Sequence, residues 1–236
     1  MIFNGEMVRA ILDGRKTQTR RIIKPQRTGS DWSVKTAETP LYERHTHDWW
    51  LPTGTRPYSA LPQCPYGAIG DRIWVRETFQ GPLFDYEEME SYLEDSSKFE
   101  KPEFCQYAAD GKPAPEYYDA DDNLHCGWRP SIHMPRWASR ILLEIIDVRV
   151  ERLNGISETD AEAEGIDMDA LADSQDCYDC IADHNMTGRP TATGAFKYLW
   201  ESIYGEENWQ ANPWVWVIEF KVVPNVPTNS TWSDLR

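Results

Sequence analysis

The stretch Gly14-Arg15-Lys16-Thr17-Gln18-Thr19-Arg20-Arg21 decides the fold. Upstream of it, Asn4 is a typical helix cap, and Met7, Ala10 and Ile11 recur at helical spacing. A short helix is therefore predicted before the stretch. Gly14 is expected to end this helix in a left-handed conformation.

Downstream of this stretch, alternation and helical spacing predict a mixture of strands and helices. The expected elements are a strand over Arg72–Thr78, a helical stretch around Tyr86–Leu93, a long strand over Ser139–Leu153, a helix capped by Ser157 and ended by Gly165, a helix over Ala195–Tyr204 and a strand over Trp214–Val223. Residues 28–69 show poor periodicity and predict a long irregular excursion. The mixed order of elements predicts the α+β class.

The charge of the chain restricts its partners. The 236 residues carry a formal net charge of −15, with a pI of about 4.7. This balance disfavours non-specific nucleic-acid binding, which depends on Lys and Arg contacts to phosphate. Two basic stretches, at residues 9–27 and 129–140, nevertheless favour a locally positive groove for a small anion or a short nucleic acid. The alternative is that these residues form a solvated face.

The remaining features argue against a membrane segment and against a cofactor. No apolar run reaches the ~18 residues of a transmembrane helix, and the N-terminus lacks the pattern of a signal peptide, so a cytoplasmic protein is expected. The five cysteines favour reduced thiols. Cys177 and Cys180 with His184 have zinc-like spacing, but no fourth ligand is evident, so neither a metal nor a cofactor is predicted.

The run Gly14–Arg21 resembles the signature of the ASCH-domain family, and Ile11–Thr19 is similar to a segment of one subgroup, the small bacterial N(4)-acetylcytidine amidohydrolases. The usual family pattern has Glu where this chain has Thr19. Further collinear similarities lie at Gly70-Asp71, Ser139–Leu153, Ile156–Gly165 and Val217–Lys221, and the whole chain resembles the long ASCH-like proteins common in phages and prophages. The resemblance implies a PUA-like mixed β-barrel with flanking helices. It also implies a single domain over 1–224, with insertions at about 28–69, 80–135 and 168–193 and a flexible tail at 225–236.

The resemblance also implies catalytic roles: Lys16 as base, Thr19 as nucleophile and Glu164 as proton relay. A threonine hydroxyl needs a neighbouring base, and Lys16 could be one only if its pKa falls from about 10.4 toward 7. The flanking Arg15, Arg20 and Arg21 would act in that direction. Because Lys16 and Thr19 are three residues apart, this mechanism requires a turn between them. The non-catalytic alternative for Glu164 is that it is a surface residue on a charged helix.

Seven residues are candidates for substrate binding, by planar hydrogen bonding or by stacking on a base. They are Arg21, Arg15, Trp74, Arg76, Trp128, Arg129 and Arg136. A structural salt bridge is the alternative for Arg21, and core packing for the tryptophans.

Two functions follow as expectations. One is an amidohydrolase that removes an acyl group from a modified cytosine nucleoside. The other is a non-catalytic module that binds RNA or a modified base. A third, fainter alternative is an inhibitor that acts through its acidic insertions at 80–125 and 167–185. The expected partner is a nucleoside or a short RNA, and the sequence does not tell whether there is a protein partner.

Overall fold

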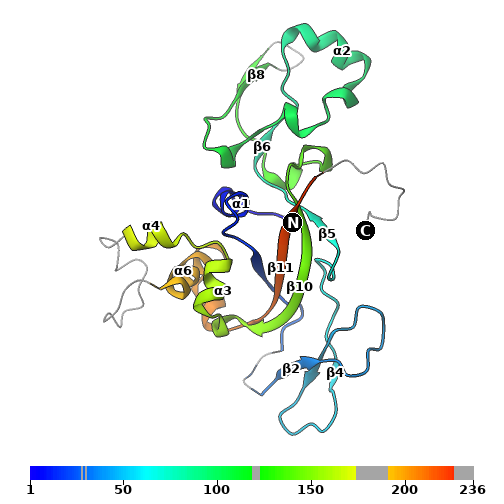
Figure 1. Cartoon of the computed structure of the whole chain (residues 1–236), viewed down its shortest axis with the longest axis vertical. Coiled ribbons are helices and arrows are strands. Elements are labelled where there is room, and N and C mark those ends of the chain that lie inside the picture. The colour runs from blue at the N-terminus through cyan, green and yellow to red at the C-terminus, as the bar shows by residue number, and fades with distance from the viewer. Residues whose placement is uncertain (28, 30, 119–122, 174–190, 226–236) are drawn as a thin grey trace. The chain divides into compact units, whose positions relative to one another are not determined.

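The computed structural model describes residues 1–27, 29, 31–118, 123–173 and 191–225, which form the predicted α+β architecture (Figure 1). The helices are α1 (Gly5–Leu12), α2 (Met89–Glu94), α3 (Glu158–Ala163), α4 (Met168–Asp173), α6 (Ala192–Tyr204) and α7 (Glu206–Gln210). The strands are β1 (Gln18–Ile22), β2 (Ser33–Thr36), β3 (His47–Trp50), β4 (Ser59–Ala60), β5 (Arg72–Trp74), β6 (Phe79–Gln80), β7 (Gln106–Tyr107), β8 (Glu116–Tyr118), β9 (Leu124–Cys126), β10 (Leu142–Arg152) and β11 (Trp214–Val223). None of the helices in the described ranges is long and apolar enough to cross a membrane.

The principal sheet is curled and has the strand order β1-β11-β10-β5 (Figure 1). β1 pairs antiparallel with β11, so that Thr19 lies opposite Ile218 and Arg20 opposite Val217. β5 pairs antiparallel with β10, with Trp74 opposite Leu142. The two long strands were predicted correctly, because their apolar residues continue over ten or more positions.

The chain divides into two compact units, each built from separate segments. Unit 1 comprises Met1–Val8, Arg72–Glu144 and Val222–Arg236, and unit 2 comprises Arg9–Asp71 and Ile145–Lys221. The strands β10 and β11 each contribute residues to both units.

The core of unit 2 joins α3 and α6 to β11. Phe196 and Trp200 of α6 pack with Ala161 of α3 and with Val215 and Val217 of β11. α3 begins as predicted, because the Ser157 hydroxyl accepts a hydrogen bond from the Asp160 amide at 3.1 Å. α6 begins three residues before the expected start, where the Thr191 side chain caps it.

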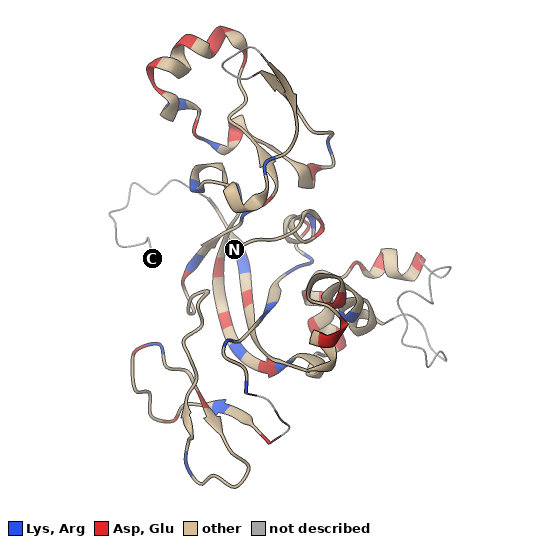
Figure 2. Cartoon of the chain, turned by 180° about the vertical axis from the view of Figure 1, so that it is seen from behind, with Lys and Arg blue, Asp and Glu red and all other residues tan. Residues whose placement is uncertain are grey.

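Unit 1 is held by a smaller cluster in which Phe79, Tyr107 and Met134 are buried. The predicted helical stretch around Tyr86–Leu93 is confirmed as a 3₁₀ turn followed by α2. Acidic residues gather along this segment (Figure 2). The strand expected over Arg72–Thr78 is shorter than predicted and ends at Trp74.

Residues 28–69 are not the irregular excursion that the sequence predicted. They contain a three-stranded antiparallel sheet, β2-β3-β4. Its strands have only two to four residues, too few for alternation to be recognised. Aromatic contacts hold it together instead: Trp32 packs edge-on against Trp49 and Tyr58, at centroid distances of 6.2 and 5.0 Å.

Candidate functional site

Lys16 and Glu164, 148 residues apart in the sequence, form a buried ion pair in unit 2. The Lys16 ammonium donates hydrogen bonds to Glu164 Oε2 and to the Glu164 carbonyl, both at 2.7 Å. The Lys16 side chain is fully buried and that of Glu164 is 4% exposed. The structure therefore brings together two of the three predicted catalytic residues.

Local backbone geometry fixes the position of this pair. α1 is capped by Asn4, whose Oδ1 accepts from the Met7 amide at 2.8 Å. Lys16 forms an isolated antiparallel bridge with Glu164, the residue that caps the C-terminus of α3. Gly165 follows with φ +95°, and a Cβ there would lie 2.8 Å from the Lys16 Cβ. The stem of Lys16 can lie this close to α3 only because residue 165 is glycine.

Thr19 does not share a face with Lys16. The predicted turn between the two residues is wrong: residues 16–22 are extended, with a bridge at Lys16 followed by β1. The backbone of this segment is paired, since the Phe220 amide donates to the Thr17 carbonyl at 2.8 Å. Alternation along a strand places Thr19 on the opposite face from Lys16, Gln18 and Arg20.

A network of charges surrounds the pair on the face shared by Lys16, Gln18 and Arg20. The Arg20 side chain is fully buried, and its guanidinium lies 3.1 to 3.2 Å from carboxylate oxygens of Glu164, Glu151 and Asp160. Gln18 Nε2 donates to the Asp160 carbonyl at 2.6 Å. The cations of this face are thus paired with carboxylates of the same unit, although the buried Nε of Arg20 has no hydrogen-bond partner among the described residues.

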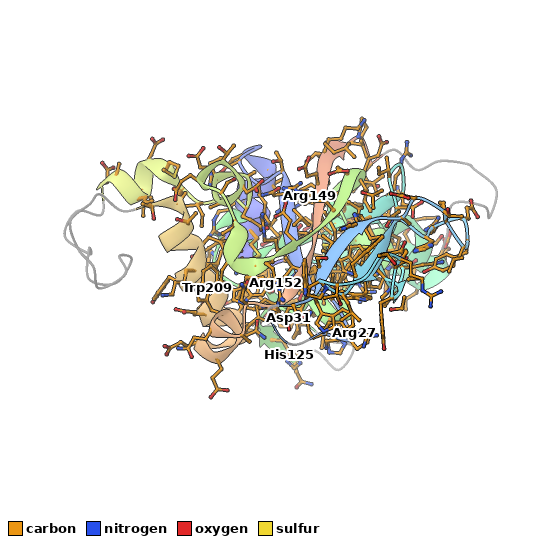
Figure 3. All side chains as sticks on the ribbon, turned by 90° about the horizontal axis from the view of Figure 1, so that it is seen from below. Arg27, Asp31, His125, Arg149, Arg152 and Trp209 are labelled. Carbon is orange, nitrogen blue, oxygen red and sulfur yellow. The ribbon has the colours of Figure 1, made fainter. Side chains whose placement is uncertain are left out.

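Arg149 of β10, which is labelled in Figure 3, also belongs to this network. Its guanidinium pairs with Glu151 at 2.6 Å, with Asp160 at 2.9 Å and with Glu219. Sequence reasoning missed Gln18, and it considered Arg20 only as a charge beside Lys16. It also missed Asp160, Glu151 and Arg149. The place of Gln18 and Arg20 in the network could have been found, because they follow Lys16 at a spacing of two in a segment that is extended.

Burial lowers the pKa of Lys16 below its ordinary value, and the nearby Arg21 and Arg20 act in the same direction, while Glu164 opposes them. The lowering of the Lys16 pKa agrees in direction with the prediction. Arg15, which was expected to contribute, donates instead to the Gly165 carbonyl at 3.0 Å and to Asp13 at 3.1 Å.

Arg21 lies on the face of β1 that Thr19 occupies. It donates to the Tyr204 hydroxyl at 3.3 Å, and its charge also acts on Tyr66, whose pKa is raised by burial. Arg21 is only half-buried, so β1 is accessible to solvent at this residue.

The other predicted substrate-binding residues belong to unit 1. Trp74, Arg76 and Arg136 come together there: the guanidinium carbons of Arg76 and Arg136 lie 4.4 and 5.9 Å from the Trp74 ring centroid. Arg129 is exposed, donates to the Gly81 carbonyl at 3.4 Å and follows the half-buried Trp128. Within unit 1, the structure thus assembles one cation–aromatic cluster from the predicted residues.

The possible metal ligands Cys177, Cys180 and His184 lie outside the described residues. Among the residues that are described, no group of three or more His, Cys, Asp or Glu side chains could hold a metal ion. Comparisons of the chain with family models, with curated proteins and with solved structures give no match.

Proposed function

We propose that this chain is a non-catalytic module that binds RNA or a modified nucleoside, and that its curled sheet is a PUA-like barrel of the ASCH type. The collinear sequence similarities and the antiparallel pairing of β1 with β11 support the fold assignment. The observation that carries the function is the cluster of Trp74 with Arg76 and Arg136. An aromatic ring beside guanidinium groups can stack on a base while the cations contact phosphate.

The ion-pair network around Lys16 supports binding over catalysis. A base must reach the proton that it abstracts, whereas the Lys16 side chain is fully buried and hydrogen-bonded to Glu164. Thr19 lies on the other face of β1 and is buried as well. In this arrangement Lys16 and Glu164 join β1 to α3 and have a structural role.

Fluorescence anisotropy with a labelled eight-nucleotide single-stranded RNA tests the binding proposal. Trp74→Ala should weaken binding by about 1 to 3 kcal/mol, the contribution of one stacked base. Arg136→Ala should weaken binding to all sequences and reduce the salt slope by about one. Arg56→Ala, which removes an exposed arginine of unit 2, is the control. Absence of salt-dependent binding to any oligonucleotide would refute the proposal.

A second function, hydrolysis of an N-acylated cytosine nucleoside, is favoured by one observation, the lowered pKa of Lys16. A lysine with a lowered pKa can act as a general base once the pair with Glu164 opens. Release of cytidine and acetate from N(4)-acetylcytidine by wild type, with loss of turnover in Lys16→Ala, would replace the binding proposal with this one. Wild-type inactivity on a panel of acylated nucleosides would remove it.

A further inference from the structure

The β2-β3-β4 sheet contains a cavity of about 370 Å³, and none of the candidate site residues described above lines it. Its polar lining includes two carboxylates, Asp48 and Glu38, together with His45. Its apolar lining includes the rings of Trp50 and Tyr58. Neither lysine nor arginine is among the lining residues, so the walls combine aromatic surface with negative charge.

Asp48 is a buried carboxylate without a cationic partner. Its side chain is 6% exposed, and its Oδ1 lies 2.9 Å from Nε2 of His45, whose side chain is 1% exposed. The Leu41 amide donates to His45 Nδ1 at 2.9 Å, so Nδ1 holds a lone pair and the proton is on Nε2. His45 is therefore a neutral donor. Of the described residues, no lysine or arginine forms an ion pair with Asp48.

Burying a carboxylate whose only partner is a neutral donor costs free energy of folding, and a cation in contact with the carboxylate offsets that cost. The aromatic walls favour a cation as well. Lys35 Nζ lies 4.2 Å from the Trp50 ring centroid, and the guanidinium carbon of Arg27 lies 5.3 Å from the Tyr58 ring centroid. Both rings therefore already take part in cation–π contacts outside the lining of the cavity.

We propose that this cavity binds a small organic cation with a planar amidinium or guanidinium head group. The N–H groups of this head group would donate to Asp48, and its plane would stack on Trp50 or Tyr58. The exposed Glu38 would add electrostatic attraction. The volume is in the range of small-molecule sites, about 300 to 1,000 Å³. This activity is separate from RNA binding, because all of its residues are in unit 2 and none belongs to the Trp74 cluster of unit 1.

Isothermal titration with benzamidine tests the proposal, because the neutral amide benzamide has nearly the same shape. Benzamidine should bind saturably at one site per chain and at least about tenfold more tightly than benzamide, since a tenfold ratio corresponds to one close charge contact. Equal binding of the two probes, or no binding of benzamidine, would overturn the proposal.

Variants locate the site. Asp48→Asn keeps the shape of the side chain and should weaken benzamidine binding at least about tenfold. Glu38→Gln should weaken it roughly two- to fivefold, because Glu38 is exposed and screened. The second variant keeps the test decisive if Asp48→Asn does not fold, as judged by circular dichroism. Glu94→Gln, an exposed acid of unit 1, should have no effect. Unchanged affinity in a folded Asp48→Asn would place the cation elsewhere, and so would unchanged affinity in Glu38→Gln if Asp48→Asn does not fold.

Discussion

A double-mutant cycle on the buried Lys16–Glu164 pair tests whether this contact holds unit 2 together. Lys16→Met replaces the ammonium by a flexible apolar group of similar length, and Glu164→Gln removes the carboxylate charge without changing its shape. Each single variant leaves one member of the pair buried with an altered partner. The double variant removes both charges together.

The magnitude follows from burial. Removing one partner of a buried ion pair costs about 3 to 5 kcal/mol, because the other charge is left unpaired. In Lys16→Met the Glu164 carboxylate keeps Arg20, whose Nη1 lies 3.2 Å from Oε1, so about 3 kcal/mol is expected. The double variant should cost less than the sum of the single variants, with a coupling energy of about 2 kcal/mol.

Urea unfolding followed by tryptophan fluorescence and far-UV circular dichroism measures these costs. With an m-value of about 2 kcal/mol per molar, the midpoint for Lys16→Met should fall by about 1.5 M. Arg15→Ala is the matched control: its side chain is 35% exposed and its ion pairs are on the surface, so it should cost less than about 1 kcal/mol. A coupling energy below about 0.5 kcal/mol would show that the two side chains do not interact.

Three further predictions concern burial and backbone strain. Burial raises the pKa of Glu77 above its ordinary value of 4.5. Just above pH 4.5 the folded state therefore binds more protons than the unfolded chain, and the free energy of unfolding falls as the pH rises. Glu77→Gln should flatten this pH dependence in thermal melts. Burial raises the pKa of the Cys105 thiol to about 11, so iodoacetamide at pH 8 should modify it about a hundredfold more slowly than an ordinary thiol, with the exposed Cys126 as internal comparison by mass spectrometry. Gly165→Ala should cost about 2 to 5 kcal/mol in urea unfolding, because φ is +95° and the new methyl group would meet Lys16 and Ala10. Gly155→Ala is the control: its methyl group meets nothing within 4 Å, so it should change stability by less than about 1 kcal/mol. An equal loss of stability in both variants would contradict the strain argument.

Local signals predicted the α+β class and the longest elements of the fold. The cap at Asn4, the cap at Ser157 and the long apolar alternation of β10 and β11 all lie within a few neighbouring residues. The β2-β3-β4 sheet could not be predicted in this way. Its strands are too short to show a period, and the contact of Trp32 with Tyr58 joins residues that are distant in the sequence.

The candidate site was predictable only in part. Similarity to a known signature pointed to Lys16 and Glu164, which do meet. The same reasoning assumed a turn that would bring Thr19 to Lys16, whereas the segment extends as a strand and separates the two faces. Asp48 and His45 carried no signal in the sequence, because their pairing depends on how the loop before β3 folds back.

The discontinuous composition of the two units limits how the protein can be dissected. The chain passes between units at four points, after residues 8, 71, 144 and 221. No single truncation from either end therefore yields one unit intact, and a fragment that begins at residue 72 lacks β1, the edge strand that pairs with β11. Expression of unit 2 alone would need a linker that joins residues 71 and 145 in place of the middle segment 72–144. Such a polypeptide retains β1, α3 and the cavity.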